Sequence, residues 1–226
     1  MNLSLRLKTL YDMVPDSICM DVGADHGKLI ISLVENNRVP FGYAVENKQG
    51  PYEKLVQEIN KSNSKDKIQP IFADGIAALT KDVKTVILAG MGGHLIVSIL
   101  QTHKDKLKNV DTILIDAHND IEFVRRSLIK LGYGIKNERI VHDMCVYYEI
   151  IEFNKSANKN LDDLDYEFGP CLRKNKDKTF QNKYEHILNR FNKLLDDENI
   201  NKERKAEIRK EKERLLEILL WIPIHS

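Results

Sequence analysis

Long apolar stretches are missing from this sequence of 226 residues, although 42% of its residues are hydrophobic. No apolar run approaches the roughly 20 residues that span a membrane. The first residues, Met1 to Arg6, also lack the apolar segment of a signal peptide. We therefore expect a cytoplasmic protein without a membrane partner.

Cysteine is scarce as well. Cys19, Cys145 and Cys171 are far apart in the sequence, so they predict buried thiols and neither a disulfide framework nor a cysteine-based metal site. A Walker lysine loop, a Ser-His-Asp order and metal-ligand spacing are all absent. We therefore expect no metal, and the sequence gives no support to a phosphoryl-transfer enzyme or a hydrolase.

The chain as a whole has no strong excess of charge of either sign, since its net charge is only +1. This balance by itself argues for no polyanionic partner. Residues 172–214, however, contain fourteen Lys or Arg against nine Asp or Glu. Such a local excess is typical either of a solvated helix face or of a surface that binds nucleic acid, and the residues alone leave both interpretations open.

Apolar runs of strand and helix type alternate up to about residue 152, which predicts a parallel sheet covered on both faces. Strands are expected near residues 17–21, 42–46, 68–72, 85–89 and 112–117, and helices near 3–14, 28–36, 50–61, 75–80, 94–101 and 120–131. Two further β-rich runs, 134–141 and 145–153, are too close for a crossover helix and should pair antiparallel. This α/β pattern resembles the seven-stranded, Rossmann-like sheet of class I methyltransferases.

The last third of the sequence changes character. Residues 154–165 are polar and predict a linker, and residues 167–170 predict a turn. Two apolar stripes with helical spacing follow, one of Phe180, Tyr184, Ile187, Phe191 and Leu194, the other of Ile208, Leu215, Ile218 and Ile222. They predict a C-terminal antiparallel helical hairpin of the coiled-coil type. We expect domains at residues 1–155 and 156–226.

The most informative motif is Asp-Val-Gly-Ala-Asp-His-Gly at residues 21–27. It follows the first strand, where open α/β sheets bind cofactors. Asp25 occupies the position between Gly23 and Gly27 where a dinucleotide loop usually carries a further glycine, and its charge would repel a pyrophosphate. S-adenosylmethionine has no phosphate, and its cationic ammonium and sulfonium would be attracted by Asp21 and Asp25. A tight turn with a helix-capping Asp would explain the motif without any ligand.

Polar and glycine residues also follow the other strands. Glu46 ends the second strand at about the spacing at which an acid reaches ribose hydroxyls. Asp74 and Gly75, after the third strand, suit either an adenine contact or a helix cap. Gly-Met-Gly-Gly at residues 90–93 indicates close backbone approach to a ligand or a strained turn. Asn119, after the fifth strand, suits a base contact or a helix cap.

Together these motifs resemble the TrmK family, bacterial tRNA (adenine-N1)-methyltransferases that act at position 22. The resemblance rests on residues 21–27, Ala-Gly-Met-Gly-Gly at 89–93, Lys-Asp-Lys-Leu at 104–107, Tyr-Tyr-Glu at 147–149 and Phe-Gly-Pro at 168–170. The chain departs from the family pattern at 27–30, where Gly-Lys-Leu-Ile replaces Ala-Tyr-Leu-Pro, and at 117–118, where Ala-His replaces Gln-Pro.

The resemblance implies methylation of N1 of adenine 22, with S-adenosylmethionine as cofactor and tRNA as partner, and no stable protein partner. Asp25 and Asn119 are the implied catalytic residues. The implied cofactor-binding residues are Asp21, Gly23, Asp25, His26, Gly27, Glu46, Asn47, Asp74, Gly75, Gly90, Met91 and Gly92. The basic hairpin would contact the tRNA backbone. Two alternatives stay open: an NAD-dependent oxidoreductase with a dimerisation arm, and a noncatalytic RNA-binding or scaffold protein.

Overall fold

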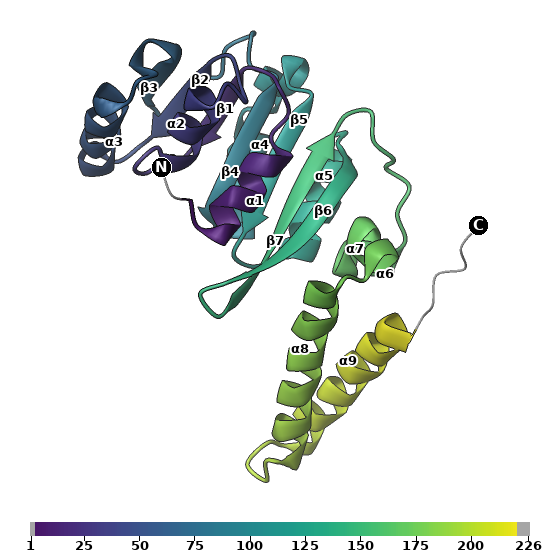
Figure 1. Ribbon diagram of the computed structural model, residues 1–226. Coiled ribbons are helices and arrows are strands. Elements are labelled where there is room, and N and C mark those ends of the chain that lie inside the picture. The colour runs from purple at the N-terminus through teal and green to yellow at the C-terminus, as the bar shows by residue number, and fades with distance from the viewer. Residues whose placement is uncertain (1–2, 221–226) are drawn as a thin grey trace. The chain divides into compact units, whose positions relative to one another are not determined.

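The computed structural model describes residues 3–220 and contains a seven-stranded sheet in the order β3-β2-β1-β4-β5-β7-β6 (Figure 1). Strands β1 to β5 are parallel, and β7 runs antiparallel to both β5 and β6. The sheet confirms the predicted class I methyltransferase fold. The strands are β1 (Cys19–Val22), β2 (Gly42–Glu46), β3 (Ile68–Phe72), β4 (Thr85–Met91), β5 (Thr112–Ala117), β6 (Gly134–Asp143) and β7 (Val146–Asn154).

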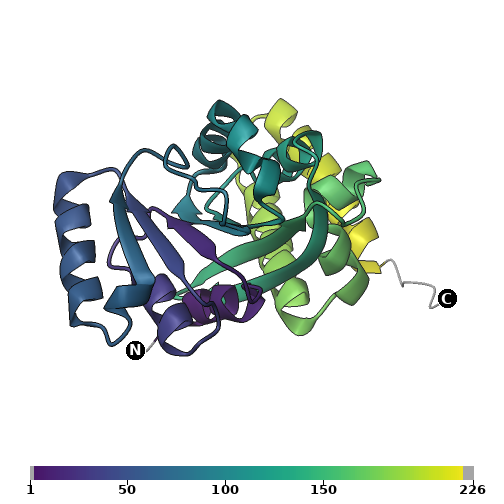
Figure 2. The ribbon, with the colours of Figure 1, turned by 90° about the horizontal axis from the view of Figure 1, so that it is seen from above.

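Helices cover both faces of the sheet (Figure 2). On one face, α1 (Leu5–Met13), α2 (Lys28–Glu35) and α3 (Gln49–Lys61) share a core with the side chains of Cys19 and Leu114. On the other face, α4 (Gly93–Thr102) and α5 (Ile121–Lys130) pack on Met20 and Ile113. Two short 3₁₀ helices, η1 (Lys65–Lys67) and η2 (Lys104–Asn109), precede β3 and β5. Strands buried on both faces are apolar along their whole length, which explains the continuous runs in the sequence.

Two local predictions were wrong. Residues 75–80 do not form a helix but a pair of tight turns, in which the Ala77 and Leu79 N–H groups bond Asp74 and Ile76. Gly75 has φ +53°, outside the helical region, and so short a segment does not repay the cost of starting a helix. Cys145 is exposed in the turn between β6 and β7 rather than buried in a strand.

The chain divides into two compact units after Cys171, whereas the sequence predicted a boundary after residue 155. The predicted linker and turn contain α6 (Asp163–Phe168), and α7 (Pro170–Asn175) follows it. Asp162 and Asp165 cap the start of α6 reciprocally. Residues 156–171 therefore belong to the unit that contains the sheet.

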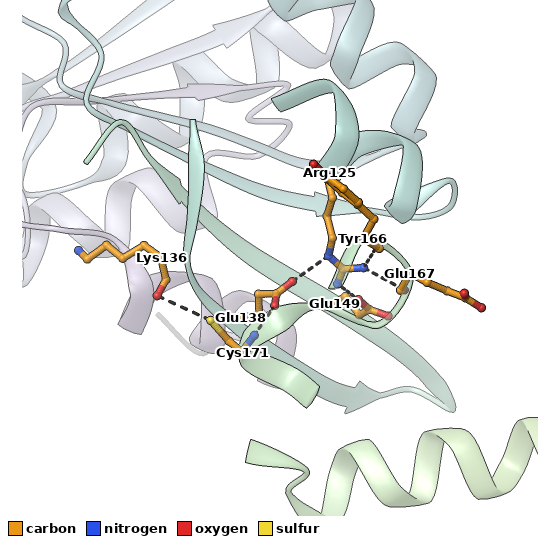
Figure 3. A network of polar contacts seen from close by, with 7 residues as sticks. All are labelled: Arg125, Lys136, Glu138, Glu149, Tyr166, Glu167 and Cys171. Atoms are coloured by element: carbon orange, nitrogen blue, oxygen red, sulfur yellow. Dashed lines mark hydrogen bonds and ion pairs between the residues drawn. The ribbon is translucent and has the colours of Figure 1, made fainter. Parts of the chain in front are cut away.

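A buried arginine fixes this segment. The Arg125 guanidinium on α5 is fully buried and pairs with Glu138 of β6 (Nε to Oε1, 2.8 Å) and Glu149 of β7. Its Nη1 donates to the carbonyls of residues 166 and 167 at 3.1 Å each (Figure 3). The other Glu138 oxygen accepts from the Cys171 N–H at 3.0 Å. The network ties α6 to α5, β6 and β7.

The glycine of the Phe-Gly-Pro motif is required by the same network. Gly169 has φ +82°, and a Cβ on it would lie 2.6 Å from both Glu138 carboxylate oxygens. Any side chain there would push α7 away from the buried carboxylate, so the motif is a packing requirement of this fold.

The second unit consists of α8 (Lys178–Asp196) and α9 (Lys202–Leu220), which contact each other as the predicted helical hairpin. Phe180 and Tyr184 are buried on α8, and Ile208 and Leu215 on α9. Lys212 Nζ also bonds Asn192 Oδ1 across the two helices at 2.7 Å. Ile222, predicted for the second stripe, lies outside the described residues. Within residues 3–220, no helix is long and apolar enough to cross a membrane.

Candidate active site

The loop at residues 21–27 lies at the carboxyl end of β1 and is shaped by three residues with positive φ: Gly23, Asp25 and Gly27. The N–H groups of Gly23 and Ala24 bond the Val45 carbonyl at 2.8 and 3.1 Å, which holds the loop against β2. Gly27 is the N-cap of α2, and a Cβ there would lie 2.8 Å from Leu55 Cδ1. The two glycines therefore permit a turn that other residues would strain.

The second glycine segment forms the end of β4. The pairing of β4 with β5 shifts between Ala89 and Met91, so Gly90 (φ +79°) forms a bulge. A Cβ on Gly90 would lie 3.0 Å from Arg6 Nη2, and one on Gly23 would lie 2.4 Å from Met91 Cε. Side chains at either glycine would fill the space above the sheet at this edge.

Two adjoining cavities open here. The α1-side cavity, about 470 Å³, lies over the 21–27 loop and the start of α1, and the β3-side cavity, about 330 Å³, lies over the ends of β2 and β3. Gly23, Ala89 and Gly90 line both. The site predicted from the sequence is thus a two-chambered cleft that narrows at two glycines.

Most of the predicted cofactor-binding residues line these cavities. Asp21, Asp25 and His26 line the α1-side cavity, and the β3-side cavity is lined by Glu46, Asn47, Asp74, Gly75 and Met91. Gly27, Gly92 and Asn119 line neither cavity.

Asp21 is the most perturbed acid of the site. It is 5% exposed, and burial raises the pKa of its carboxyl group to about 7. Within residues 3–220, its carboxylate has no hydrogen-bond or ion-pair partner. A buried carboxylate that faces a cavity and lacks a partner is suited to bind a cation or a hydrogen-bond donor.

Asp25 differs sharply from Asp21. Its side chain is 70% exposed and lies 3.7 Å from His26 Nε2. Its φ of +50° is unusual for a residue other than glycine. Asp25 can therefore reach a molecule that enters the α1-side cavity from solvent.

The acids of the β3-side cavity are held in place. Glu46 Oε1 accepts from the N–H groups of Asn47 and Lys48 at 3.1 and 3.2 Å. Asn47 Nδ2 donates to Asp74 Oδ1 at 3.0 Å. These bonds join the ends of β2 and β3 and leave one carboxylate oxygen on each acid for a ligand.

Asn119 supports the glycine segment from behind. Its Oδ1 accepts from the Gly93 N–H at 3.0 Å, at the first residue of α4. A Cβ on Gly93 would lie 2.6 Å from the Asn119 carbonyl oxygen. Asn119 thus caps α4 rather than the helix after it, and its side-chain amide nitrogen remains available.

Sequence reasoning missed one group of residues. Arg6 of α1 lines the α1-side cavity, its Nε pairs with Asp116 of β5, and its guanidinium lies 4.7 Å from the centre of the Tyr148 ring. Asp116 is 1% exposed; burial raises its pKa and Arg6 partly opposes the shift. The three residues are far apart in the sequence, so no local motif could have revealed them. Within the described residues, no cluster suited to a metal ion is found.

The fold and site agree with the comparisons. Residues 19–218 match the family described as TrmK, tRNA (adenine(22)-N(1))-methyltransferase. The tRNA (adenine(22)-N(1))-methyltransferase of Bacillus subtilis (strain 168) is 27% identical, over 97% of this chain and 98% of the relative.

Two solved structures are also similar over almost the whole chain. Streptococcus pneumoniae Sp1610 in complex with S-adenosyl-L-methionine is 29% identical with a TM-score of 0.88, over 96% of this chain and 100% of that one. M. capricolum TrmK in complex with S-adenosyl-homocysteine is 25% identical with a TM-score of 0.83, over 95% and 96%.

Proposed function

Because the chain belongs to the TrmK family of tRNA (adenine(22)-N(1))-methyltransferases, we propose that it methylates N1 of adenine 22 of tRNA. It is an S-adenosylmethionine-dependent enzyme, as the bound cofactor and cofactor product in its relatives support. Since tRNA is the proposed substrate, we also propose a cytoplasmic location.

The buried carboxylate of Asp21 carries the cofactor assignment. Burial without a partner raises its pKa to about 7, so a cation that enters the α1-side cavity gains an ion pair that the protein itself does not supply. The ammonium group of S-adenosylmethionine has this charge. The residues present therefore fit the cofactor.

The β3-side cavity would hold the adenosyl part. Glu46, fixed by two backbone N–H groups, would accept from the ribose hydroxyls with its second oxygen. Asp74, fixed by Asn47, and the backbone of Gly75 would contact the adenine ring of the cofactor. S-adenosylmethionine supplies a methyl group on a sulfonium, and Gly23 and Gly90 leave room for this group where the cavities join.

Methylation at N1 requires positioning more than base catalysis, since the N1 lone pair of adenine is already a nucleophile. Asp25, exposed at the α1-side cavity, would accept a hydrogen bond from the N6 amino group. A carboxylate there raises the electron density at N1 and stabilises the positive charge of the product ring. The Asn119 amide nitrogen would contact the base from the α4 side.

N1 lies on the Watson–Crick edge, so the base must leave its stack before it can react, at a cost of a few kcal/mol. Contacts to the tRNA backbone would offset this cost. The α8–α9 hairpin, with its excess of Lys and Arg, is our candidate for such contacts, which read phosphate position and shape rather than sequence.

The decisive test is methyl transfer from labelled S-adenosylmethionine to unmodified tRNA transcripts with adenine or guanine at position 22. We expect label on the adenine transcript only, and a loss of about a hundredfold or more in rate for Asp25→Ala, the lower end for a group that stabilises charge in the transition state. Lys67→Gln, at the amino end of β3, serves as a control with no expected effect. Equal labelling of both transcripts would contradict the assignment.

A further inference from the structure

The α1-side cavity has opposite charges at its inner and outer ends. At the inner end lies Asp21, 5% exposed, and Asp116, 1% exposed, lies below Arg6. At the outer end, Lys28 is exposed and the Arg6 side chain is 21% exposed, and both line the cavity together with the exposed Asp25. Two cations therefore lie at the mouth beside one acid, whereas the inner end is acidic.

Arg6 is held in one orientation. Its Nε is bonded to Asp116, its guanidinium plane is supported by the Tyr148 ring, and its backbone N–H donates to Asp143 Oδ2 at 3.0 Å. These contacts leave the two terminal nitrogens without a described partner, and Nη2 lies next to Gly90. A fixed fork of N–H donors at a cavity mouth is suited to an oxyanion.

Lys28 completes the outer end. It is the first residue of α2, and no ion pair is recorded for it within residues 3–220. Arg6 comes from α1 and Lys28 from α2, so two separate helices bring a cation to the same opening.

The cofactor carboxylate would occupy only part of this set of donors. The ammonium and carboxylate of one amino acid share a carbon atom, so a carboxylate near Asp21 would stay close to β1. Arg6 is anchored to β5, two strands away in the order β1-β4-β5, and its Nη2 lies beside Gly90 of β4, the strand between them. Lys28 at the start of α2 and the other terminal nitrogen of Arg6 remain for a second anion.

We propose that Arg6 and Lys28 bind the phosphate of the target nucleotide, which rests on the proposed function. A nucleotide methylated at adenine N1 carries a positive ring and a negative phosphate. The ring would face Asp25 while the phosphate meets Arg6 and Lys28. The same arrangement would admit an extruded nucleotide with its base inward, because the reverse orientation would place like charges together.

The test compares the affinity and the kcat/KM for tRNA of wild type, Arg6→Gln, Lys28→Gln and the double variant at several salt concentrations. Each substitution should lower affinity by about tenfold and flatten the salt slope by about 0.7, with unchanged affinity for S-adenosylmethionine by calorimetry. Lys8→Gln removes a cation two residues further along α1 that does not line the cavity, and it is the matched control.

A substrate variant identifies the phosphate. In a tRNA with one uncharged methylphosphonate linkage beside nucleotide 22, wild type should bind as weakly as Arg6→Gln binds the normal tRNA. Arg6→Gln should lose nothing further on the modified tRNA. The double variant Arg6→Gln, Asp116→Asn removes both partners of the ion pair, so no buried charge is left without its partner. It should bind the normal and the modified tRNA as Arg6→Gln does, which would exclude misfolding as the cause.

Two results would overturn the proposal. The first is a loss of cofactor affinity in Arg6→Gln with an unchanged salt slope, which would place Arg6 on the cofactor carboxylate. The second is full wild-type affinity for every methylphosphonate tRNA. Binding is measured alongside turnover. Absence of methyl transfer by wild type would therefore count against the proposed function, and the binding data would still test the phosphate contact.

Discussion

At the scale of single residues, the buried carboxylate of Asp21 lowers the stability of the fold but favours cofactor binding. Its pKa in the folded chain is about 7, above the ordinary value of 3.8, so the folded state holds the proton more tightly and stability falls as the pH rises between these values. Asp21→Asn removes this penalty. We expect the variant without cofactor to be up to about 4 kcal/mol more stable at pH 8, yet to bind S-adenosylmethionine far more weakly.

Denaturant unfolding of both proteins from pH 5 to pH 8 measures this difference, and calorimetry measures the cofactor. The stability gain should shrink as the pH falls, because wild-type Asp21 becomes protonated. Asp66→Asn, at an exposed acid, controls for the charge change and should stay within about 0.5 kcal/mol. A gain that is independent of pH would contradict the buried-charge explanation.

Single residues also show how much of the site could be predicted from the sequence. Residues that follow a strand directly, such as Asp21 and Glu46, were placed at the cleft because parallel strands end at one edge. Arg6, Asp116 and Tyr148 were not found. They meet only through the packing of α1 against β5 and β7, and no spacing in the sequence encodes that contact.

At the scale of elements, the Arg125 network joins α6 to the sheet. Arg125→Met would remove a buried positive charge that pairs with Glu138 and Glu149, and we expect a loss of about 3–5 kcal/mol in unfolding free energy at pH 8. Burial already raises the pKa of Glu138 while Arg125 lowers it, so without Arg125 both acids should protonate more readily. The deficit should therefore narrow towards pH 5.

Arg126→Met is the matched control for this prediction. Arg126 is the next residue on α5 and pairs with Glu122 and Asp163 at the surface, so its loss should cost no more than about 1 kcal/mol. Equal losses in both variants, or a deficit at Arg125 that does not change with pH, would show that the buried charges are not the cause.

Elements with long apolar runs were predictable, and those held by distant contacts were not. The central strands β1, β4 and β5 were placed within one or two residues because burial on both faces makes them mostly apolar. Residues 163–168 looked like part of a polar linker, and their helix is stabilised by a capping box and by Arg125, about forty positions away. The expected helix at 75–80 failed although Ile76 and Leu79 are buried at helical spacing, because Gly75 has a positive φ and so short a segment does not repay the cost of starting a helix.

At the scale of the whole molecule, the question is what the α8–α9 unit contributes. The cleft and its cavities are complete within residues 3–171. The hairpin contributes an excess of basic residues instead. The simplest interpretation is that the unit with the sheet carries out the methyl transfer and the hairpin binds the tRNA backbone.

Neutral variants of the hairpin test this division. Arg209 and Lys210 are exposed on α9, and if they contact phosphates, changing both to Gln should flatten the salt slope of tRNA affinity by about 1.4 to 1.8. The rate at saturating tRNA should not change, because neither residue lines the cavities of the cleft. Changing Lys65 and Lys67 to Gln, at η1 before β3, removes the same charge from the unit that contains the sheet. If both double variants flatten the salt slope equally, the hairpin acts only through its net charge. If neither double variant flattens the slope, the basic residues of the hairpin are a solvated helix face.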